Sequence, residues 1–246
     1  MAHSHNDYER ARPLFDALKQ HFLSVEADIH FINNRLYVAH DAENIAPDRT
    51  LQSLYLEPLR EQIRKNGGFV YNKATPLVLF IDIKTGADST YLALTDVLNA
   101  YSDILTSYQN DDIHRGAVDV VISGNRPLEI MKTQKIRYAS YDGRITDLES
   151  NLPASLLSFI SDNWTKYFEW TGSGKFPDAE KQNLYSIVKQ AHEKGRKVRF
   201  WKTDVDTLEY QINLWNELLN AGVDIINTDK IVALKDFLDN QKKTVN

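Results

Sequence analysis

Leu77-Val-Leu-Phe-Ile-Asp-Ile-Lys84 is the most apolar run of the chain and the strongest indication of its fold class. Its length and its content of Val, Ile, Leu and Phe predict a strand buried on both faces, as in a parallel sheet covered by helices. Strand-like runs of this kind recur along the chain. They are Leu23–Ile29, Leu36–Ala39, Pro76–Ile83, Ala117–Ile122, Ile136–Tyr141, Leu156–Ile160, Val198–Trp201 and Val223–Ile226.

Helical patterns lie between these runs. They are Arg12–His21, Leu56–Lys65, Ser89–Ser107, Asp178–Lys194, Leu208–Ala221 and Ile231–Asn240. Glycines at positions 195 and 222 mark two of the helix ends. About eight β–α units in 246 residues predict an α/β protein, a single (β/α)8 TIM barrel in which residues 1–246 form one domain. An open doubly wound sheet is the structural alternative, but the chain has no glycine-rich nucleotide fingerprint.

The composition excludes several classes of protein. With no Cys, the chain has no disulfides, no thiolate metal sites and no Cys nucleophile. The 29 Lys and Arg against 34 Asp and Glu give a net charge of −5, which argues against a nucleic-acid partner. A local site can still be basic, so a small anionic substrate stays possible. No oligomeric state is predicted.

The amino-terminal sequence MAHSHNDYER is polar and is neither a signal peptide nor a targeting helix. No stretch reaches the 18 or more apolar residues of a membrane span. Because a His-rich motif begins only two residues into the chain, we expect that natural sequence was removed upstream of Ala2, with an export signal as one candidate. The absence of Cys fits either compartment, so no localisation is predicted.

Acidic side chains share one face of the second strand, Ser24-Val-Glu-Ala-Asp-Ile-His30. Side chains alternate along a strand, so Glu26, Asp28 and His30 point one way and the apolar residues between them point the other. In a barrel, function lies where strands end. Two carboxylates in a partly dry site repel unless a cation neutralises them, and oxygen ligands favour Mg²⁺ or Ca²⁺. A solvated edge strand is the alternative.

Asp82 and Lys84 share a face at the end of the most apolar run. An acid at this place completes the oxygen shell of a cation, and a lysine beside it holds a phosphate oxygen or a developing negative charge. A simple structural ion pair between the two residues explains the pattern equally well.

Three histidines are candidates for acid–base chemistry, since imidazole is the proton carrier suited to neutral pH. His3 and His5 lie two residues apart at the end of a first strand, and His40 closes the run Leu36–Ala39. His30 is either near the site or part of the core. The remaining histidines, His21, His114 and His192, are expected on the surface.

The His3-Ser-His5 spacing also opens the metal sites of amidohydrolase-type barrels. Those sites need further histidines after later strands, where this chain has Ser140-Tyr-Asp-Gly143 and Ser161-Asp-Asn-Trp164. Asp229 after the last strand fits the pattern. An amidohydrolase-type metal-dependent hydrolase therefore remains an alternative.

The motifs taken together resemble the PLC-like phosphodiesterase superfamily, which includes glycerophosphodiester phosphodiesterases and spider-venom sphingomyelinase D enzymes. The resemblance covers essentially the whole chain. Within the superfamily, the chain most resembles a branch that carries the HSHNDY opening. Its motifs are Ala2-His3, Glu26-Ala-Asp28, His40-Asp41, Phe80-Ile-Asp82-Ile-Lys84-Thr-Gly86, Val121-Ile-Ser-Gly-Asn-Arg126, Ile160-Ser-Asp-Asn-Trp164, Ala191–Trp201 and Ala221–Asp229. The Asp82 strand is closest to the sphingomyelinase D form. The Pro-Glu-Asn-Thr turn usual in glycerophosphodiesterases is missing, so specificity for glycerophosphodiesters does not follow.

The resemblance implies a (β/α)8 barrel that binds one divalent cation, Mg²⁺ or Ca²⁺, and cleaves a phosphodiester with two histidines as general acid and base. The family's metal ligands match Glu26, Asp28 and Asp82. One catalytic histidine matches His40. The other matches His3, which is preferred, with His5 as the alternative.

The substrate is expected to be a small-molecule phosphodiester or a phospholipid. The residues expected to bind it or its phosphate are Lys84, Arg126, Trp201 and Asn6. Arg126 is equally well explained as a surface residue at a helix start, and Trp164 and Trp170 either wall the same cavity or belong to an aromatic core. A non-catalytic barrel that binds phosphorylated ligands is the alternative from a different class.

Overall fold

The structure is a computed structural model that describes residues 1–71, 75–109 and 112–244. The chain forms two compact units. One comprises residues 6–142; the other comprises residues 1–5 and 143–246. Within the described residues, no helix is both long enough and apolar enough to cross a membrane.

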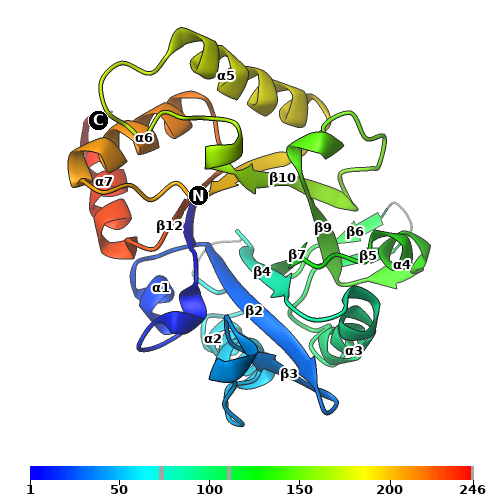
Figure 1. Ribbon diagram of the computed structural model, residues 1–246. Helices are drawn as coiled ribbons and strands as arrows, with labels where there is room; N and C mark the ends of the chain where they lie inside the picture. The colour runs from blue at the N-terminus through cyan, green and yellow to red at the C-terminus, as the bar shows by residue number, and fades with distance from the viewer. Residues whose placement is uncertain (72–74, 110–111, 245–246) are drawn as a thin grey trace. The chain divides into compact units, whose positions relative to one another are not determined.

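The unit of residues 6–142 is built on parallel strands. Their order is β9-β7-β4-β2, and β3 pairs antiparallel with the far end of β2 (Figure 1). Its strands are β2 (Ser24–Ile32), β3 (Arg35–Val38), β4 (Leu77–Ile83), β5 (Ser107–Gln109), β6 (Asp112–His114), β7 (Val118–Gly124), β8 (Ile136–Arg137) and β9 (Ala139–Gly143). Its helices are η1 (Asp7–Glu9), α1 (Phe15–Lys19), η2 (Ala42–Asn44), η3 (Gln52–Leu56), α2 (Glu57–Lys65), α3 (Ala87–Asn99) and α4 (Leu128–Thr133).

Among its described residues, the other unit has four parallel strands, in the order β1-β12-β11-β10. Helix α5 packs against β11, α6 against β12 and α7 against β1 (Figure 1). The strands are β1 (Ala2–Ser4), β10 (Leu157–Asn163), β11 (Lys197–Trp201) and β12 (Ile225–Thr228). The helices are η4 (Ile145–Asp147), η5 (Trp164–Lys166), α5 (Asp178–Glu193), α6 (Leu208–Asn220) and α7 (Ile231–Thr244).

Strand β4, which contains the most apolar run of the sequence, is buried as predicted. Every residue of β4 except Asp82 is inaccessible or nearly so, because the strand pairs with β2 on one side and β7 on the other. The register aligns Asp28 with Asp82 and Asp82 with Ser123. The polar ends of three neighbouring strands therefore lie at the same edge of this sheet.

Some predicted elements differ from the structure. The helix predicted over Arg12–His21 is shorter in the structure, where it is α1. It cannot begin earlier because Leu14 has φ +65° and its backbone amide donates a hydrogen bond to the Asp7 carboxylate. The helix predicted over Ser89–Ser107 ends at Asn99, and the chain then turns into β5. The run Ile136–Tyr141 is divided between β8, which pairs with β5, and β9, which joins the parallel strands.

Candidate active site

The acidic residues predicted to bind a cation come together in the unit of residues 6–142. One carboxylate oxygen from each of Glu26, Asp28 and Asp82 lies within 4.8 Å of the others. Glu26 and Asp28 are buried, while Val25, Ala27 and Ile29 between and beside them are completely inaccessible. The alternation along β2 thus places the acids on one face and the apolar residues on the other.

Lys84 is paired with two of these acids. Its Nζ lies 3.0 Å from Asp28 Oδ2 and 3.1 Å from Asp82 Oδ1. With Glu26 included, three carboxylates and one ammonium leave a formal charge of −2. A divalent cation would bring that charge to zero.

The donor set fits a hard divalent cation. Oδ1 of Asp28 is buried and has no hydrogen-bond partner in the part of the chain that the structure describes. A buried carboxylate oxygen without a donor is costly, and a cation would relieve that cost. Because the ligands are all carboxylates, Mg²⁺ or Ca²⁺ suits them better than a softer metal.

The titration of the acidic residues reflects their crowding. Burial raises the pKa of Asp82 to about 6; Lys84 opposes the rise, and Glu26 and Asp28 add to it. Burial also raises the pKa of Asp28, and the charge of Glu26 adds to the effect. Burial would lower the pKa of Lys84, but the charges of Asp82 and Asp28 outweigh it and raise that pKa.

Gly124 leaves room for the Asp82 carboxylate. The residue ends β7 with φ +69°, and a Cβ built there would lie 2.3 Å from Asp82 Oδ1. A left-handed backbone favours glycine, and here the missing side chain also matters for packing. Gly124 lies within the motif Val121–Arg126, but the motif alone does not indicate this packing role.

His40 follows β3 and lies beside the acidic residues. Its Nδ1 is 3.1 Å from Asp28 Oδ2 and 3.0 Å from the hydroxyl of Tyr8, and its side chain is 52% exposed. Its Nε2 has no hydrogen-bond partner among the described residues. The ring is therefore anchored through one nitrogen, and the other is available to a substrate.

Tyr8 is a residue of the site that the sequence analysis missed. Its buried hydroxyl contacts Asp28, His40 and, at 2.9 Å, the side-chain amide of Asn6. Asn6, predicted to bind substrate, thus contacts the site through Tyr8. The HSHNDY opening contains Tyr8, but only its place beside the catalytic candidates in the fold reveals a role.

Two of the predicted histidines belong to the other unit, in different surroundings. His3 is fully buried, and its Nε2 lies 3.0 Å from the guanidinium of Arg199. His5 is partly exposed, and its Nδ1 lies 2.9 Å from Asp229 Oδ1. Arginine can only donate, so the Nε2 lone pair of His3 accepts its hydrogen bond. An amidohydrolase-type site would need that lone pair for a metal.

The remaining predicted substrate-binding residues occupy strand ends. Arg126 follows β7, donates to the carbonyl of Asp142 and lies 4.8 Å above the ring centre of Tyr141. Trp201 ends β11 and is half-buried.

Trp164 and Trp170 are buried in an aromatic core. Trp164 stacks on Phe168 and meets Phe200 edge-on, and Trp170 stacks on Phe176. Their indole nitrogens donate to backbone carbonyls.

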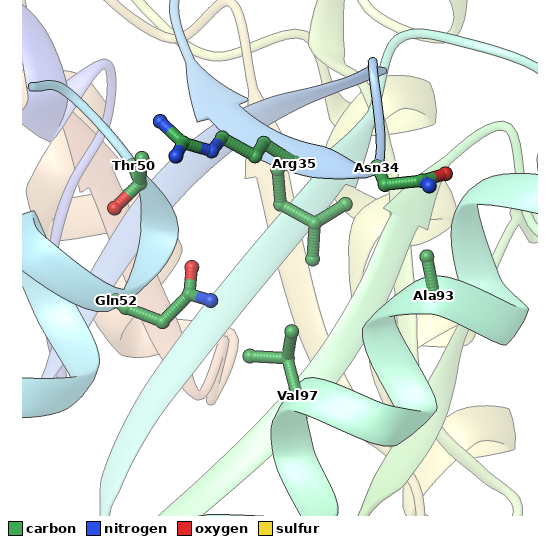
Figure 2. Close-up of a pocket in the computed structure, with 7 residues that line it drawn as sticks. Asn34, Arg35, Thr50, Gln52, Ala93 and Val97 are labelled. Atoms are coloured by element: carbon green, nitrogen blue, oxygen red, sulfur yellow. The ribbon is translucent and has the colours of Figure 1, made fainter. Parts of the chain in front are cut away.

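Two of the hollows among the described residues lie in the unit of residues 6–142. One, of about 340 Å³, is lined by His40 and by Tyr8, Glu9, Arg10, Val38, Ala39, Asn44 and Arg49. The other, of about 320 Å³, lies between the β2–β3 turn, η3 and α3, where Figure 2 shows Gln52 and Val97 facing it below Arg35. Only the first contains a predicted catalytic residue, so it is the better candidate for a substrate.

Comparisons with known proteins identify the family of the chain and the fold that it shares. Residues 1–142 match a family described as the AIM6-like phosphodiesterase domain. The chain is 31% identical over 263 residues to an Altered inheritance of mitochondria protein 6 homolog of Arthroderma benhamiae, covering 96% of this chain and 82% of that protein. It is 30% identical over 266 residues to Altered inheritance of mitochondria protein 6 of Eremothecium gossypii, covering 96% and 68%.

A solved structure is also similar. The glycerophosphoryl diester phosphodiesterase from Parabacteroides distasonis matches with a TM-score of 0.57 and 13% identity, covering 98% of this chain and 86% of that one. This likeness confirms the predicted (β/α)8 barrel fold. The chain belongs to the AIM6-like phosphodiesterase domain family, and the predicted resemblance to the PLC-like phosphodiesterase superfamily is confirmed.

Proposed function

We propose that this chain is a phosphoric diester hydrolase that depends on one divalent cation, Mg²⁺ or Ca²⁺, and uses two histidines as general acid and base. The observation that carries the proposal is the division of labour between the two oxygens of the buried Asp28. One oxygen contacts His40 and Lys84, and the other has no hydrogen-bond donor among the described residues. The proposal treats residues 1–246 as one domain, supported by a phosphodiesterase likeness that spans 98% of the chain.

Glu26, Asp28 and Asp82 would hold the cation. A cation there supplies Lewis-acid stabilisation to a phosphate oxygen. Lys84 keeps its charge and would add a positive group that stabilises the phosphate. Arg126 is proposed to bind phosphate, and Asn6 and Trp201 to contact the substrate.

His40 is assigned to proton transfer at Nε2, because its Nδ1 is held by Asp28. For the second proton carrier, the surroundings support His5 over His3. His5 has an Asp229 partner on Nδ1 and a partly exposed ring, whereas His3 is buried with its Nε2 on Arg199. One histidine takes a proton from the attacking hydroxyl as its oxygen bonds to phosphorus. The other gives a proton to the leaving oxygen as that P–O bond breaks.

Turnover of bis(p-nitrophenyl) phosphate in the presence of Mg²⁺ or Ca²⁺ tests the proposal against a non-catalytic barrel that only binds phosphorylated ligands. Release of p-nitrophenol supports hydrolysis. Binding without release on this diester, on glycerophosphodiesters and on phospholipids in vesicles would instead identify a binding protein. A glycerophosphodiester carries a hydroxyl of its own, so its product identifies the attacking group: a phosphomonoester if water attacks, and a cyclic phosphate if the substrate's own hydroxyl attacks.

The two amino-terminal histidines should respond differently to alanine. We expect His5→Ala to lower kcat by about 10²–10⁴-fold, the usual contribution of a general acid or base, with little change in Tm. His3→Ala should lower stability by about 1–3 kcal/mol, because Arg199 loses a buried acceptor. Both are measured by kcat below the unfolding transition and by thermal melts. A His5 variant with full kcat would contradict the assignment.

Cation affinity should fall as the pH falls through about 6. Protons compete with the cation for the Asp82 carboxylate, whose pKa is raised to about 6. At about pH 5, Asp82 is protonated in about ten-elevenths of the molecules. Protonation of this group alone therefore raises the Kd for the cation about tenfold relative to about pH 7.5. Isothermal titration of the protein with Mg²⁺ at both pH values checks this. An affinity that does not change with pH would be inconsistent with Asp82 as a ligand, and Asp82→Asn should bind weakly at both.

A further inference from the structure

The hydroxyl of Tyr8 is at the centre of the hydrogen bonds that surround Asp28. It lies 2.6 Å from Asp28 Oδ2 and 3.0 Å from His40 Nδ1, and only 2% of the residue is exposed. A tyrosine hydroxyl is protonated at neutral pH, so it can donate a hydrogen bond. The short distance identifies the carboxylate as the acceptor, since hydrogen bonds from a hydroxyl to an anion are the shorter ones.

The two oxygens of Asp28 have different surroundings. Oδ2 is contacted by the Tyr8 hydroxyl, by His40 Nδ1 at 3.1 Å and by Lys84 Nζ at 3.0 Å. Oδ1 is buried and has no hydrogen-bond partner among the described residues. A carboxylate that rotated about its Cβ–Cγ bond would exchange these positions, so something must hold it in this orientation.

We propose that Tyr8 is a positioning residue that fixes the orientation of Asp28, holding Oδ2 toward His40 and Lys84 and leaving Oδ1 for the divalent cation. This inference rests on the proposed function, because it assigns Oδ1 to the cation of that site. Lys84 also contacts Oδ2, but it is shared with Asp82 on a flexible side chain. The Tyr8 ring is rigid and buried, so its hydroxyl has little freedom to follow a rotating carboxylate.

The backbone that carries Tyr8 is itself held in place. The preceding Asn6 has φ +47° and ψ +38°, a left-handed conformation that turns the chain into η1. The carbonyl of Tyr8 accepts a hydrogen bond from the guanidinium of Arg49. Next to it, Asp7 Oδ2 accepts from the Leu14 amide at 2.6 Å and from the Tyr55 hydroxyl at 3.0 Å. These contacts fix the backbone on both sides of Asp7 and Tyr8, and so they fix the position of the Tyr8 ring.

The variant Tyr8→Phe removes the hydroxyl and keeps the ring. We expect the Kd for Mg²⁺ and for Ca²⁺, measured by isothermal titration with the metal alone, to rise about 10–100-fold, as when a group that orients a metal ligand is lost. We also expect kcat on a chromogenic phosphodiester to fall while KM changes little. Tyr101→Phe is the matched control, because that buried hydroxyl also donates to a carboxylate, Glu57, outside the site.

The cation titration separates this inference from the proposed function. Weakened cation binding in Tyr8→Phe, with Tyr101→Phe unchanged, supports the positioning role even if no phosphodiester is hydrolysed. Unchanged affinity in a folded Tyr8→Phe would overturn it, even if the chain is an active phosphodiesterase. If Tyr8→Phe does not fold, the Cζ resonance of Tyr8 in the wild-type protein decides. A shift on adding Mg²⁺ supports the contact with a cation-binding Asp28, and no shift overturns it.

Discussion

Replacing His40 with alanine is expected to lower the kcat for phosphodiester hydrolysis by about 10²–10⁴-fold. The variant loses the ring whose Nδ1 is anchored on Asp28 and whose Nε2 is left for the substrate. Because the side chain is 52% exposed and Asp28 Oδ2 keeps Tyr8 and Lys84 as partners, its removal should change the unfolding free energy by no more than about 1 kcal/mol. Steady-state kinetics and a thermal melt measure the two effects.

His192 offers a matched control for this variant. Its Nε2 lies 2.8 Å from Asp224, and its side chain is 43% exposed, so it is also a partly exposed histidine paired with an aspartate. His192→Ala should keep the wild-type kcat. Full turnover by His40→Ala would remove the basis of the catalytic assignment.

Removal of the cation is expected to have the second large effect. An excess of chelator should abolish turnover, and Mg²⁺ or Ca²⁺ should restore it, since a Lewis acid on a phosphate oxygen contributes several kcal/mol, or about 10²–10⁴ in rate. Glu26→Gln removes one of the three clustered carboxylates, so it should bind the cation weakly and fail to regain activity when the cation is added.

Glu57→Gln is a suitable control for the carboxylate substitution. Glu57 accepts a hydrogen bond from Tyr101 and takes no part in the acidic cluster. Its variant should respond to chelation and to added cation like the wild-type protein. Rates that stay constant in excess chelator would show that hydrolysis needs no cation.

Strong apolar patterns made the parallel strands predictable. β4, β7 and β11 lie within a residue or two of their predicted bounds, because strands buried on both faces need continuous apolar sequence. The small antiparallel strands β5 and β6 were not predicted, since strands of three residues are too short to carry such a signal. Helix α1 was overestimated because the carboxylate of Asp7, a long-range partner, fixes the backbone of Leu14.

The acidic cluster was predictable for a similar reason. Alternation along β2 places Glu26 and Asp28 on one face, and the parallel register brings Asp82 beside Asp28. Tyr8 was not predictable in this way. It lies in a three-residue helix, and it meets Asp28 only through a turn that depends on the left-handed Asn6.

Lys84 gives the acidic cluster a countercharge that belongs to the chain itself. The ammonium is a permanent part of the chain and contacts both Asp28 and Asp82. A cluster of three bare carboxylates would oppose the last stage of folding, whereas one that already holds a cationic side chain opposes it less. If the proposed cation binds there, folding and cation loading can occur as separate events, and we expect that removing and restoring the cation does not unfold the protein.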